Sequence, residues 1–524
     1  MSSRAQKEDA IVGMDLGTTN SVVASVNDAG KPTVIANSEG KQTTPSVVGF
    51  DETGGVIVGS EAKNSALAYP DRTFSDVKGL RGQVTDDGKP VPAGSVDGKE
   101  VLPAEVEAHI LRKLKVDAET FLDRDVTKAV ISVPAYFGDA ARQATRDAGR
   151  IAGLEVVRIV NEPTAAAVAY GVRTDKDGTI LVHDLGGGTL DVSIIRCSSK
   201  CFEVSATGGD RDLGGTDFDN LLCEFVLDAF ESEHGFKPDP VSDTAAMQDL
   251  KDRVERARIS LSTRQKTVIS FSARGKQLTL ETTREQLEEM IGDLVEQTMD
   301  VTQQVLDDSG LKMADIDDVI LVGGASRTPM VRRRFVERFG KEPSTAGVEP
   351  DLAVAKGCAI LAVSPDISET TGSDEGGLSR TVIDVCSHPL GVEAVDPGSG
   401  QRTVSVIIPR NSRVPAQEER VYSLEKDLQT KVRIKIVQGE EGTPTDSDEC
   451  ETIGELVLEK LPRKLPREPR ISVRFGYTVD GIIEAEAVDL ISGISTSGRI
   501  ENRPGMTDDE IAKAREDVEG TLMA

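Results

Sequence analysis

The sequence predicts an α/β domain built from two related lobes, followed by an all-β sandwich. In the first two-thirds of the chain, short β-branched runs alternate with amphipathic helical stretches, which is typical of an α/β domain. The turn at residues 15–19 recurs at residues 184–189, each time directly after an apolar strand, and this repeat indicates a duplicated fold. Beyond about residue 384, apolar side chains occupy every second position, as they do in half-buried strands.

The chain has 524 residues, which is too long for one hydrophobic core, because single cores stop growing at about 250–300 residues. Residues 364–380 are rich in Ser, Thr, Gly, Asp and Glu, a composition that predicts a linker. We therefore expect four segments. They are an α/β domain at 1–365, a linker at 366–384, a β-sandwich at 385–503 and a short charged helix at 504–524, capped at Thr507.

The charge and the apolar pattern exclude several kinds of partner. The chain has 61 Lys and Arg residues against 89 Asp and Glu residues, so its net charge of −28 repels nucleic-acid phosphates and anionic lipids. No apolar stretch approaches the ~20 residues that cross a bilayer, and the first ten residues are polar. Six scattered cysteines are typical of reduced thiols. We expect a cytoplasmic protein that binds neither nucleic acid nor membrane.

The periodicity of the sequence places individual elements. Apolar residues at helical spacing predict a helix at residues 103–122. A second helix begins after Thr283, which forms a capping box with Gln286, and ends at Gly310. The pair Asp480-Gly481 predicts a hairpin turn. Strands are expected at residues 11–14, 129–133, 180–182 and 319–322 in the α/β domain, and at 432–436, 471–475 and 483–487 in the sandwich.

The two repeated turns are candidate phosphate-binding loops. Glycines let backbone amides approach phosphate oxygens, threonine hydroxyls add donors, and a leading aspartate can orient water bound to magnesium. The alternative for one such turn is a tight β-turn in which glycine serves only backbone geometry, whereas two copies favour phosphates held between the halves of a duplicated fold. The loops comprise Asp15, Gly17, Thr18 and Thr19 in the first copy and Asp184, Gly186, Gly187, Gly188 and Thr189 in the second.

Other nucleotide-binding motifs do not occur in the sequence. There is no G-x-x-x-x-G-K-[ST], and no G-x-G-x-x-G follows a strand, so a P-loop and a dinucleotide-binding fold are both disfavoured. A third glycine turn at residues 322–327 again follows an apolar strand. Its Gly323 and Gly324 can pass close to a base or a ribose. The alternative is a βα turn in which Ser326 caps the following helix.

Longer motifs carry a resemblance to a known family. Together with the three glycine turns, the segments at residues 133–137, 161–167 and 213–219 resemble the DnaK family of seventy-kilodalton heat-shock chaperones. In the β-rich part, residues 408–411, 437–440 and 479–482 are similar to the same family. The resemblance extends from about residue 10 to residue 503. It implies an actin-like ATPase domain of two lobes that close on ATP, followed by a β-sandwich that binds peptides.

The resemblance also implies catalytic and metal-binding roles. Lys78 matches the family lysine that orients the attacking water, and Thr189 lies near the γ-phosphate. Carboxylates that hold a metal and water are the tools that phosphoryl transfer requires. The implied catalytic residues are Asp15, Lys78, Glu162, Asp184, Thr189 and Asp191; of these, Asp15, Glu162, Asp184 and Asp191 surround Mg²⁺ and its K⁺ companions.

Further positions match the family's contacts with ATP and ADP. Glu255, Arg258 and Ser262 share one face of a helix, and arginine stands at 258 where the family commonly has lysine. Arg327 can stack on adenine, and Asp351 closes the ribose side. The nucleotide-binding set is therefore Gly17, Thr18, Thr19, Gly186, Gly187, Gly188, Glu255, Arg258, Ser262, Gly323, Gly324, Arg327 and Asp351.

The peptide cleft is matched by five apolar or aromatic positions. A cleft for extended apolar segments requires such side chains, but alternating apolar residues in any sandwich also fill its core, and this alternative stays open. The five positions are Val392, Val395, Tyr422, Val432 and Ile434.

Three segments depart from the family pattern. The linker keeps only Val382 and Ile383 of the usual leucine run, which weakens the expected coupling between domains. The following segment, residues 384–390, has its usual proline displaced, and residues 82–99 are short for the family. We expect residues 504–524 to begin a truncated helical lid, so that peptide release is fast.

The predicted function is an ATP-hydrolysing chaperone that binds and releases extended apolar segments of unfolded proteins. A J-domain co-chaperone and a nucleotide-exchange factor are the partners that the resemblance implies. Two alternatives stay open. One is an ATP-responsive scaffold with weak peptide capture; the other is a sugar kinase with the actin-like fold, in which the β-sandwich would have no place.

Overall fold

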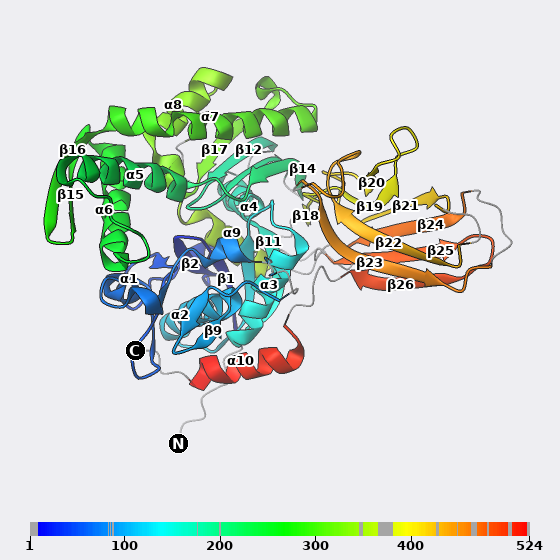
Figure 1. Cartoon of the computed structure of the whole chain (residues 1–524), viewed down its shortest axis with the longest axis horizontal. Helices are drawn as coiled ribbons and strands as arrows, with labels where there is room; N and C mark the ends of the chain where they lie inside the picture. The colour runs from blue at the N-terminus through cyan, green and yellow to red at the C-terminus, as the bar shows by residue number, and fades with distance from the viewer. Residues whose placement is uncertain are drawn as a thin grey trace.

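The structure is a computed structural model of the whole chain. It describes residues 9–81, 83, 85, 89–174, 177–198, 201–344, 349–364, 381–425, 429–447, 449–462, 469–478, 482–500 and 506–520. The α/β domain lies on the left in Figure 1, and the β-sandwich extends from it to the right. Within the described ranges, no helix is both long and apolar enough to span a bilayer.

The first lobe is built on a mixed sheet with the strand order β11-β10-β1-β2-β3, in which β4 also pairs with β2. Strand β1 runs antiparallel to β2 and parallel to β10. Helices α2 (Pro103–Leu122) and α3 (Asp139–Ile151) complete its core. The strands are β1 (Ala10–Leu16), β2 (Asn20–Val26), β3 (Pro32–Val34), β4 (Thr44–Pro45), β10 (Val126–Val133) and β11 (Glu155–Asn161).

The second lobe repeats this arrangement with the strand order β17-β12-β13-β14-β18. Here β12 runs antiparallel to β13 and parallel to β17, so each lobe has a hairpin whose first strand pairs with a later parallel strand. This equivalence supports the duplication predicted from the repeated turns. The strands are β12 (Gly178–Leu185), β13 (Leu190–Cys197), β14 (Cys201–Asp210), β17 (Asp318–Val322) and β18 (Thr381–Ile383).

Helices cover the outer part of the second lobe. The long helix α7 begins at the predicted capping box, in which Thr283 and Gln286 cap each other, and it ends at Gly310 with φ of 68°. The helices and the outer hairpin are α5 (Gly215–His234), α6 (Thr244–Thr263), β15 (Lys266–Ala273), β16 (Lys276–Thr283), α7 (Arg284–Ser309) and α8 (Pro329–Phe339).

Two helices lie between the sheets of the lobes, α4 (Glu162–Thr174) and α9 (Ala353–Ala362) (Figure 1). Their close approach needs glycine, because a Cβ on Gly357 would lie 1.8 Å from the Ala165 carbonyl oxygen. Likewise a Cβ on Gly13 of β1 would lie 2.1 Å from the Ala359 nitrogen. Because glycine has no side chain, α9 can pack closely against both α4 and β1.

Short elements surround the first lobe near the gap between the lobes. Strands β5, β6 and β7 form one small sheet, and β8 and β9 form another. These elements are β5 (Val48–Phe50), β6 (Val56–Val58), α1 (Ser60–Ser65), η1 (Pro70–Arg72), β7 (Thr73–Phe74), η2 (Val77–Leu80), β8 (Gly94–Val96) and β9 (Lys99–Val101).

The β-sandwich consists of two four-stranded antiparallel sheets, β20-β19-β22-β23 and β21-β24-β25-β26, around one apolar core. The predicted strands fall within β22, β24 and β25. The pair Asp480-Gly481 lies outside the described residues, but β24 and β25 do pair in antiparallel register. The strands are β19 (Leu390–Val395), β20 (Arg402–Ile408), β21 (Ala416–Tyr422), β22 (Lys431–Gln438), β23 (Glu451–Glu459), β24 (Ile471–Tyr477), β25 (Ile483–Asp489) and β26 (Ser495–Ile500).

The sandwich is joined to the second lobe by strand β18. Most of the predicted linker lies outside the described residues, but Thr381–Ile383 pairs parallel with β14. The side chain of Val382 is buried there. Residues 381–383 thus extend the sheet of the second lobe, and the two apolar residues that remain of the linker run do contact the α/β domain.

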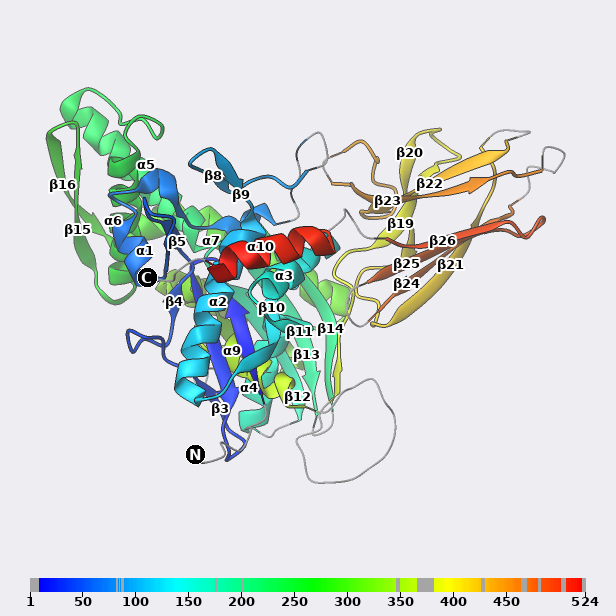
Figure 2. The same ribbon diagram turned by 90° about the horizontal axis from the view of Figure 1, so that it is seen from below.

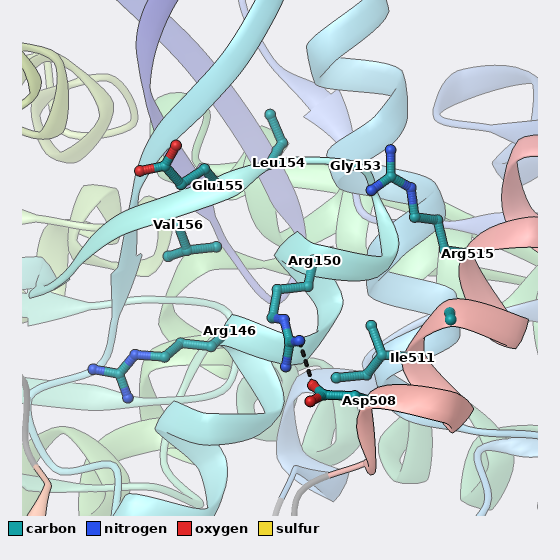
Figure 3. Close-up of a pocket in the computed structure, with 10 residues that line it drawn as sticks. Arg146, Arg150, Gly153, Leu154, Glu155, Val156, Asp508, Ile511 and Arg515 are labelled. Atoms are coloured by element: carbon teal, nitrogen blue, oxygen red, sulfur yellow. Dashed lines mark hydrogen bonds and ion pairs between the residues drawn. The ribbon is translucent and has the colours of Figure 1, made fainter.

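The last described helix, α10 (Asp508–Gly520), lies against α2 and α3 of the first lobe (Figure 2). Ile511, Ala514 and Val518 join the core of that lobe. A pocket lies at this contact, and Arg150 of α3 points toward Asp508, with an ion pair of 2.6 Å (Figure 3). The segment expected to begin a lid is thus a helix, and in this structure it covers part of the first lobe.

Candidate functional site: the gap between the glycine turns

The two repeated turns contact each other across the gap between the lobes. A Cβ on Gly187 would lie 2.1 Å from the Thr19 hydroxyl oxygen, and a Cβ on Gly188 would lie 3.2 Å from the Thr18 methyl carbon. The second turn also abuts the beginning of α5, where the amide of Thr216 donates to the Gly187 carbonyl at 2.7 Å. At Gly187 a larger residue would collide with the Thr19 side chain, so the close approach of the two turns depends on glycine there.

Four carboxylates gather beside the two turns, at the ends of elements from both lobes. Asp15 lies near the end of β1, Glu162 begins α4, and Asp184 and Asp191 are opposite each other in the β12–β13 hairpin. The Ser132 hydroxyl donates to Asp15 Oδ1 at 2.8 Å. The Tyr136 amide donates to Asp191 Oδ1 at 3.0 Å. Two of the carboxylates are thus oriented by donors of the first lobe.

Burial and repulsion make three of these carboxylates, Asp15, Asp184 and Asp191, hard to ionise. Burial, with repulsion from Glu162, raises the pKa of Asp15 to about 7 and that of Asp191 also to about 7. The pKa of Asp184 is raised well above its usual value by burial and then by repulsion from Glu162, Asp191 and Asp15. Such buried like charges are stable as anions only when cations balance them.

Lys78 supplies one balancing cation. Its side chain is 4% exposed, and its ammonium group lies 2.6 Å from Glu162 Oε1. The charge of Lys78 also favours ionisation of Asp15, Asp184 and Asp191. When all four carboxylates are ionised, one lysine among them leaves an excess of negative charge at the site.

The donor set suits a hard cation, because all four acidic side chains offer oxygen ligands. Within the described ranges, no three His, Cys, Asp or Glu side chains are grouped so that they could coordinate a metal ion together. A cation at this site would accordingly contact part of the set through water, as Mg²⁺, which keeps several of its waters, commonly does.

A pocket extends from the first glycine turn to helix α6. Thr18 and Thr19 line one part of it, and Glu255 and Arg258 line another. Two ion pairs fix these α6 side chains. Lys63 of α1 pairs with Glu255, and Arg258 binds Asp219 of α5 through two hydrogen bonds of 2.7 and 2.9 Å. Ser262, also predicted here, donates to the Arg258 carbonyl of its own helix at 3.2 Å.

The third glycine turn lies next to the second one. Gly323 has φ of 80°, and a Cβ there would lie 2.6 Å from Asp184 Oδ1. Arg327 and Asp351 face each other as an exposed ion pair at 2.6 Å. The Ser326 hydroxyl donates to the Val322 carbonyl, so its hydrogen bond is not that of a helix cap. The turn thus places Arg327 and Asp351 together.

Comparison with known proteins identifies the family. The family model of the Hsp70 protein matches residues 11–523. The chain belongs to the Hsp70 family. It is 42% identical over 522 residues to the chaperone protein DnaK of Thermotoga petrophila, and also to that of Thermotoga maritima, covering 98% of this chain and 84% of each relative. Against the chaperone protein DnaK of Halobacterium salinarum the identity is 41%, covering 98% and 78%.

Membership in the Hsp70 family confirms several predictions. The chain is a chaperone with ATPase activity, and it combines an actin-like α/β domain with a β-rich domain. It therefore binds nucleotide, as chaperones of this type do. The alternatives of a scaffold and of a sugar kinase are not favoured.

The five residues predicted for the Hsp70 peptide cleft differ in exposure. Val392 and Ile434 are buried in the sandwich core, whereas Val395 is 44% exposed. Tyr422 and Val432 are half-buried and pack against the core, and the Tyr422 hydroxyl donates to Ser405 Oγ at 3.2 Å. Val392 and Ile434 thus fit the core interpretation, and the cleft stays a prediction for the set.

Several residues of the site escaped prediction from the sequence. Ser132 and Tyr136 orient two carboxylates, and Asp219 holds Arg258. Tyr136 and Asp219 do lie within the family motifs at 133–137 and 213–219, which was their only signal. Lys63 comes from a short helix without any motif, and only the folded chain brings it to Glu255.

Proposed function

We propose that the opposed glycine turns of this Hsp70 chain hold the triphosphate of ATP, and that the neighbouring carboxylates and Lys78 direct its hydrolysis to ADP and phosphate. The observation that carries the proposal is the excess of buried carboxylates directly beside two touching glycine-threonine turns. Without a bound cation, such a cluster would oppose folding. A cation that binds both these carboxylates and the phosphates of ATP would explain why the carboxylates are grouped there.

Mg²⁺ is the proposed metal, with K⁺ as a companion. Asp15, Glu162, Asp184 and Asp191 would hold it, in part through water. When bound, Mg²⁺ neutralises charge on the phosphates during phosphoryl transfer. The oxygen-only donors, and the raised pKa values of Asp15, Asp184 and Asp191, support this assignment.

The chain's own groups have distinct proposed tasks. Backbone amides of Gly17, Gly187 and Gly188, with the hydroxyls of Thr18, Thr19 and Thr189, bind phosphate oxygens. The Gly186 amide instead donates to the Thr189 carbonyl and closes the turn. Lys78 orients the attacking water, and its ion pair with Glu162 fixes the ammonium group. Glu255, Arg258, Ser262, Arg327 and Asp351, with the turn at Gly323 and Gly324, hold the nucleoside.

Hydrolysis is proposed to control the binding of extended apolar segments of unfolded proteins at the cleft residues Val392, Val395, Tyr422, Val432 and Ile434. We further propose a J-domain co-chaperone and a nucleotide-exchange factor as partners, and a cytoplasmic location. The exposed Val395 and the half-buried Tyr422 support a peptide contact most directly.

Single-turnover hydrolysis tests the catalytic part. Thr189→Ala and Asp191→Asn should slow hydrolysis by about 10²-fold, the size of effect seen when one preorganised polar group is removed, while nucleotide affinity changes little. Thr263→Ala is the matched control, because Thr263 is an exposed residue on α6 outside the gap. Unchanged hydrolysis in both site variants would refute the assignment.

Peptide affinity tests the coupling. Fluorescence anisotropy with a labelled apolar peptide should give micromolar binding that weakens when ATP is added. Affinity that is indifferent to nucleotide would instead favour a scaffold. The same measurement on Tyr422→Ala should show weaker binding in both nucleotide states.

A further inference from the structure

The segment between β18 and β19, whose proline is displaced from the usual position, lies in the interface between the domains. Its Ser387 is buried, and the Ser387 hydroxyl donates to the Ala135 carbonyl of the first lobe. His388 Nε2 lies 2.9 Å from the Tyr136 carbonyl oxygen. Since a carbonyl oxygen only accepts, Nε2 carries the hydrogen. The imidazole also packs on the Tyr136 ring, with 4.4 Å between the ring centroids.

The same short stretch of backbone reaches the candidate catalytic site. The peptide group between Ala135 and Tyr136 has its carbonyl on one edge and its N–H on the other, because a trans peptide is planar. The carbonyl accepts from Ser387, and the N–H donates to Asp191 Oδ1 at 3.0 Å. One rigid peptide unit therefore connects the sandwich to a buried carboxylate of the nucleotide site.

Arg142 of α3 fixes the remaining polar groups of this stretch. Its guanidinium donates to the Ala135 carbonyl at 3.1 Å and to the Phe137 carbonyl at 3.0 Å. The carbonyls of residues 135–137 are thus all occupied, by Arg142 from the first lobe and by residues 387 and 388 from the sandwich side. Residues 387 and 388 therefore share the task of orienting these peptide groups with Arg142.

We propose that Ser387 and His388 are positioning residues, which hold the Ala135–Tyr136 peptide and thereby orient the Asp191 carboxylate according to the placement of the sandwich. The inference rests on the role proposed above for Asp191. The two side chains transmit a change in the sandwich, such as peptide binding, to the hydrolysis site. Hydrogen bonds in series polarise one another, which strengthens this link.

The test is the ratio of single-turnover ATP hydrolysis rates of the full chain with and without a saturating apolar peptide. In the double variant Ser387→Ala/His388→Leu, two hydrogen bonds are lost, and the ratio should move toward one by at least about fivefold, the factor that loss of a single ordinary hydrogen bond gives. Leucine keeps an apolar contact with Tyr136 but has no donor. Nucleotide affinity and the thermal unfolding midpoint should stay close to those of the parent chain.

Ser387→Thr/His388→Gln keeps both donors and should restore the ratio, which a loss of packing alone would not allow. The matched control is Arg413→Ala, which removes the interface ion pair with Glu203 but touches no part of residues 135–137. An unchanged ratio in the donorless variant, equal losses in the donorless and donor-keeping variants, or an equal loss in the control would each overturn the proposal.

Asp191→Asn separates this inference from the proposed function. If hydrolysis by Asp191→Asn is as fast as by the parent chain, the role of Asp191 itself is wrong. If Asp191→Asn is slow while the donorless variant keeps the parent ratio, only the positioning role of Ser387 and His388 fails.

Discussion

Two buried ion pairs, one in each domain, differ in the charges that surround them. Lys78 and Glu162 are 4% and 10% exposed, and three further carboxylates surround them. Arg470 and Asp489 of the sandwich are 1% and 0% exposed, and Asp489 also accepts hydrogen bonds from Ser492 and from the Ile491 amide. The charges balance in the sandwich and do not balance in the α/β domain. Burial of an ion pair is therefore no sign of a functional site, whereas an uncompensated excess of like charge is.

The strongest way to break this comparison is Lys78→Ala. Because Lys78 pairs with Glu162 and its charge also acts on Asp15, Asp184 and Asp191, loss of its ammonium group should slow single-turnover ATP hydrolysis by about 10²- to 10³-fold. Lys266→Ala is the control, since the ion pair of Lys266 with Glu281 is exposed, and it should hydrolyse ATP at the parent rate. If Lys78→Ala hydrolysed ATP at the parent rate, the ion pair of Lys78 with Glu162 would have only a structural role, like the ion pair of Arg470 with Asp489.

Arg470→Ala should show the opposite behaviour. Leaving Asp489 buried without its partner should lower the free energy of unfolding of the sandwich by about 3–5 kcal/mol, measured by thermal or denaturant unfolding, with nucleotide affinity unchanged. Replacing the pair with apolar residues, Arg470→Met/Asp489→Leu, should recover much of that stability. The equivalent replacement Lys78→Met/Glu162→Leu should not restore hydrolysis. If it did, the distinction between the two pairs would be lost.

The excess charge predicts a pH dependence of the protein without metal or nucleotide. The pKa values of Asp15 and Asp191 are raised from 3.8 to about 7, so between roughly pH 4 and 7 the folded chain binds protons that the unfolded chain has released. For these two groups the free energy of unfolding should therefore fall as pH rises through this range, by about 1.4 kcal/mol per pH unit and group. Their contribution should level off above pH 7, whereas Asp184, whose pKa is also raised, adds to the fall. Thermal unfolding at several pH values should show a weaker dependence in Asp15→Asn/Asp191→Asn. Equal dependence in both proteins would contradict the raised pKa values.

The smallest effect is expected at the rim of the predicted cleft. Val395 is 44% exposed, so Val395→Ser should leave the unfolding midpoint unchanged and weaken peptide binding by a few-fold, in line with a loss of about 1 kcal/mol of apolar contact. Val421→Ser is a matched control, because Val421 is 41% exposed on β21 and belongs to no predicted site. Equal peptide affinity of the two variants would remove Val395 from the cleft.

Local patterns predicted much of the fold. The capping box at Thr283 and Gln286 and the stop at Gly310 depend on neighbours in sequence, and the structure confirms all three. The turns at Asp15 and Asp184 were recognisable because glycine, threonine and aspartate occur together directly after apolar strands. Features that depend only on neighbouring residues in the chain, such as helix caps and turns, could therefore be predicted from the sequence.

Roles that depend on distant segments were not predictable in this way. Lys78 has no local signal of burial, and its partner Glu162 is 84 residues away. The alternation of apolar residues around Val392 and Val395 could not separate core from cleft, because both kinds of position prefer the same side chains. The contacts of Ser387 and His388 with residues 135 and 136 span about 250 residues and two domains.

The sandwich is fastened to the α/β domain on both sides of its own sequence. Before it, β18 extends the sheet of the second lobe; after it, α10 lies on the first lobe. The two attachments lie on different lobes, so a change in the angle between the lobes would change the distance between β18 and α10.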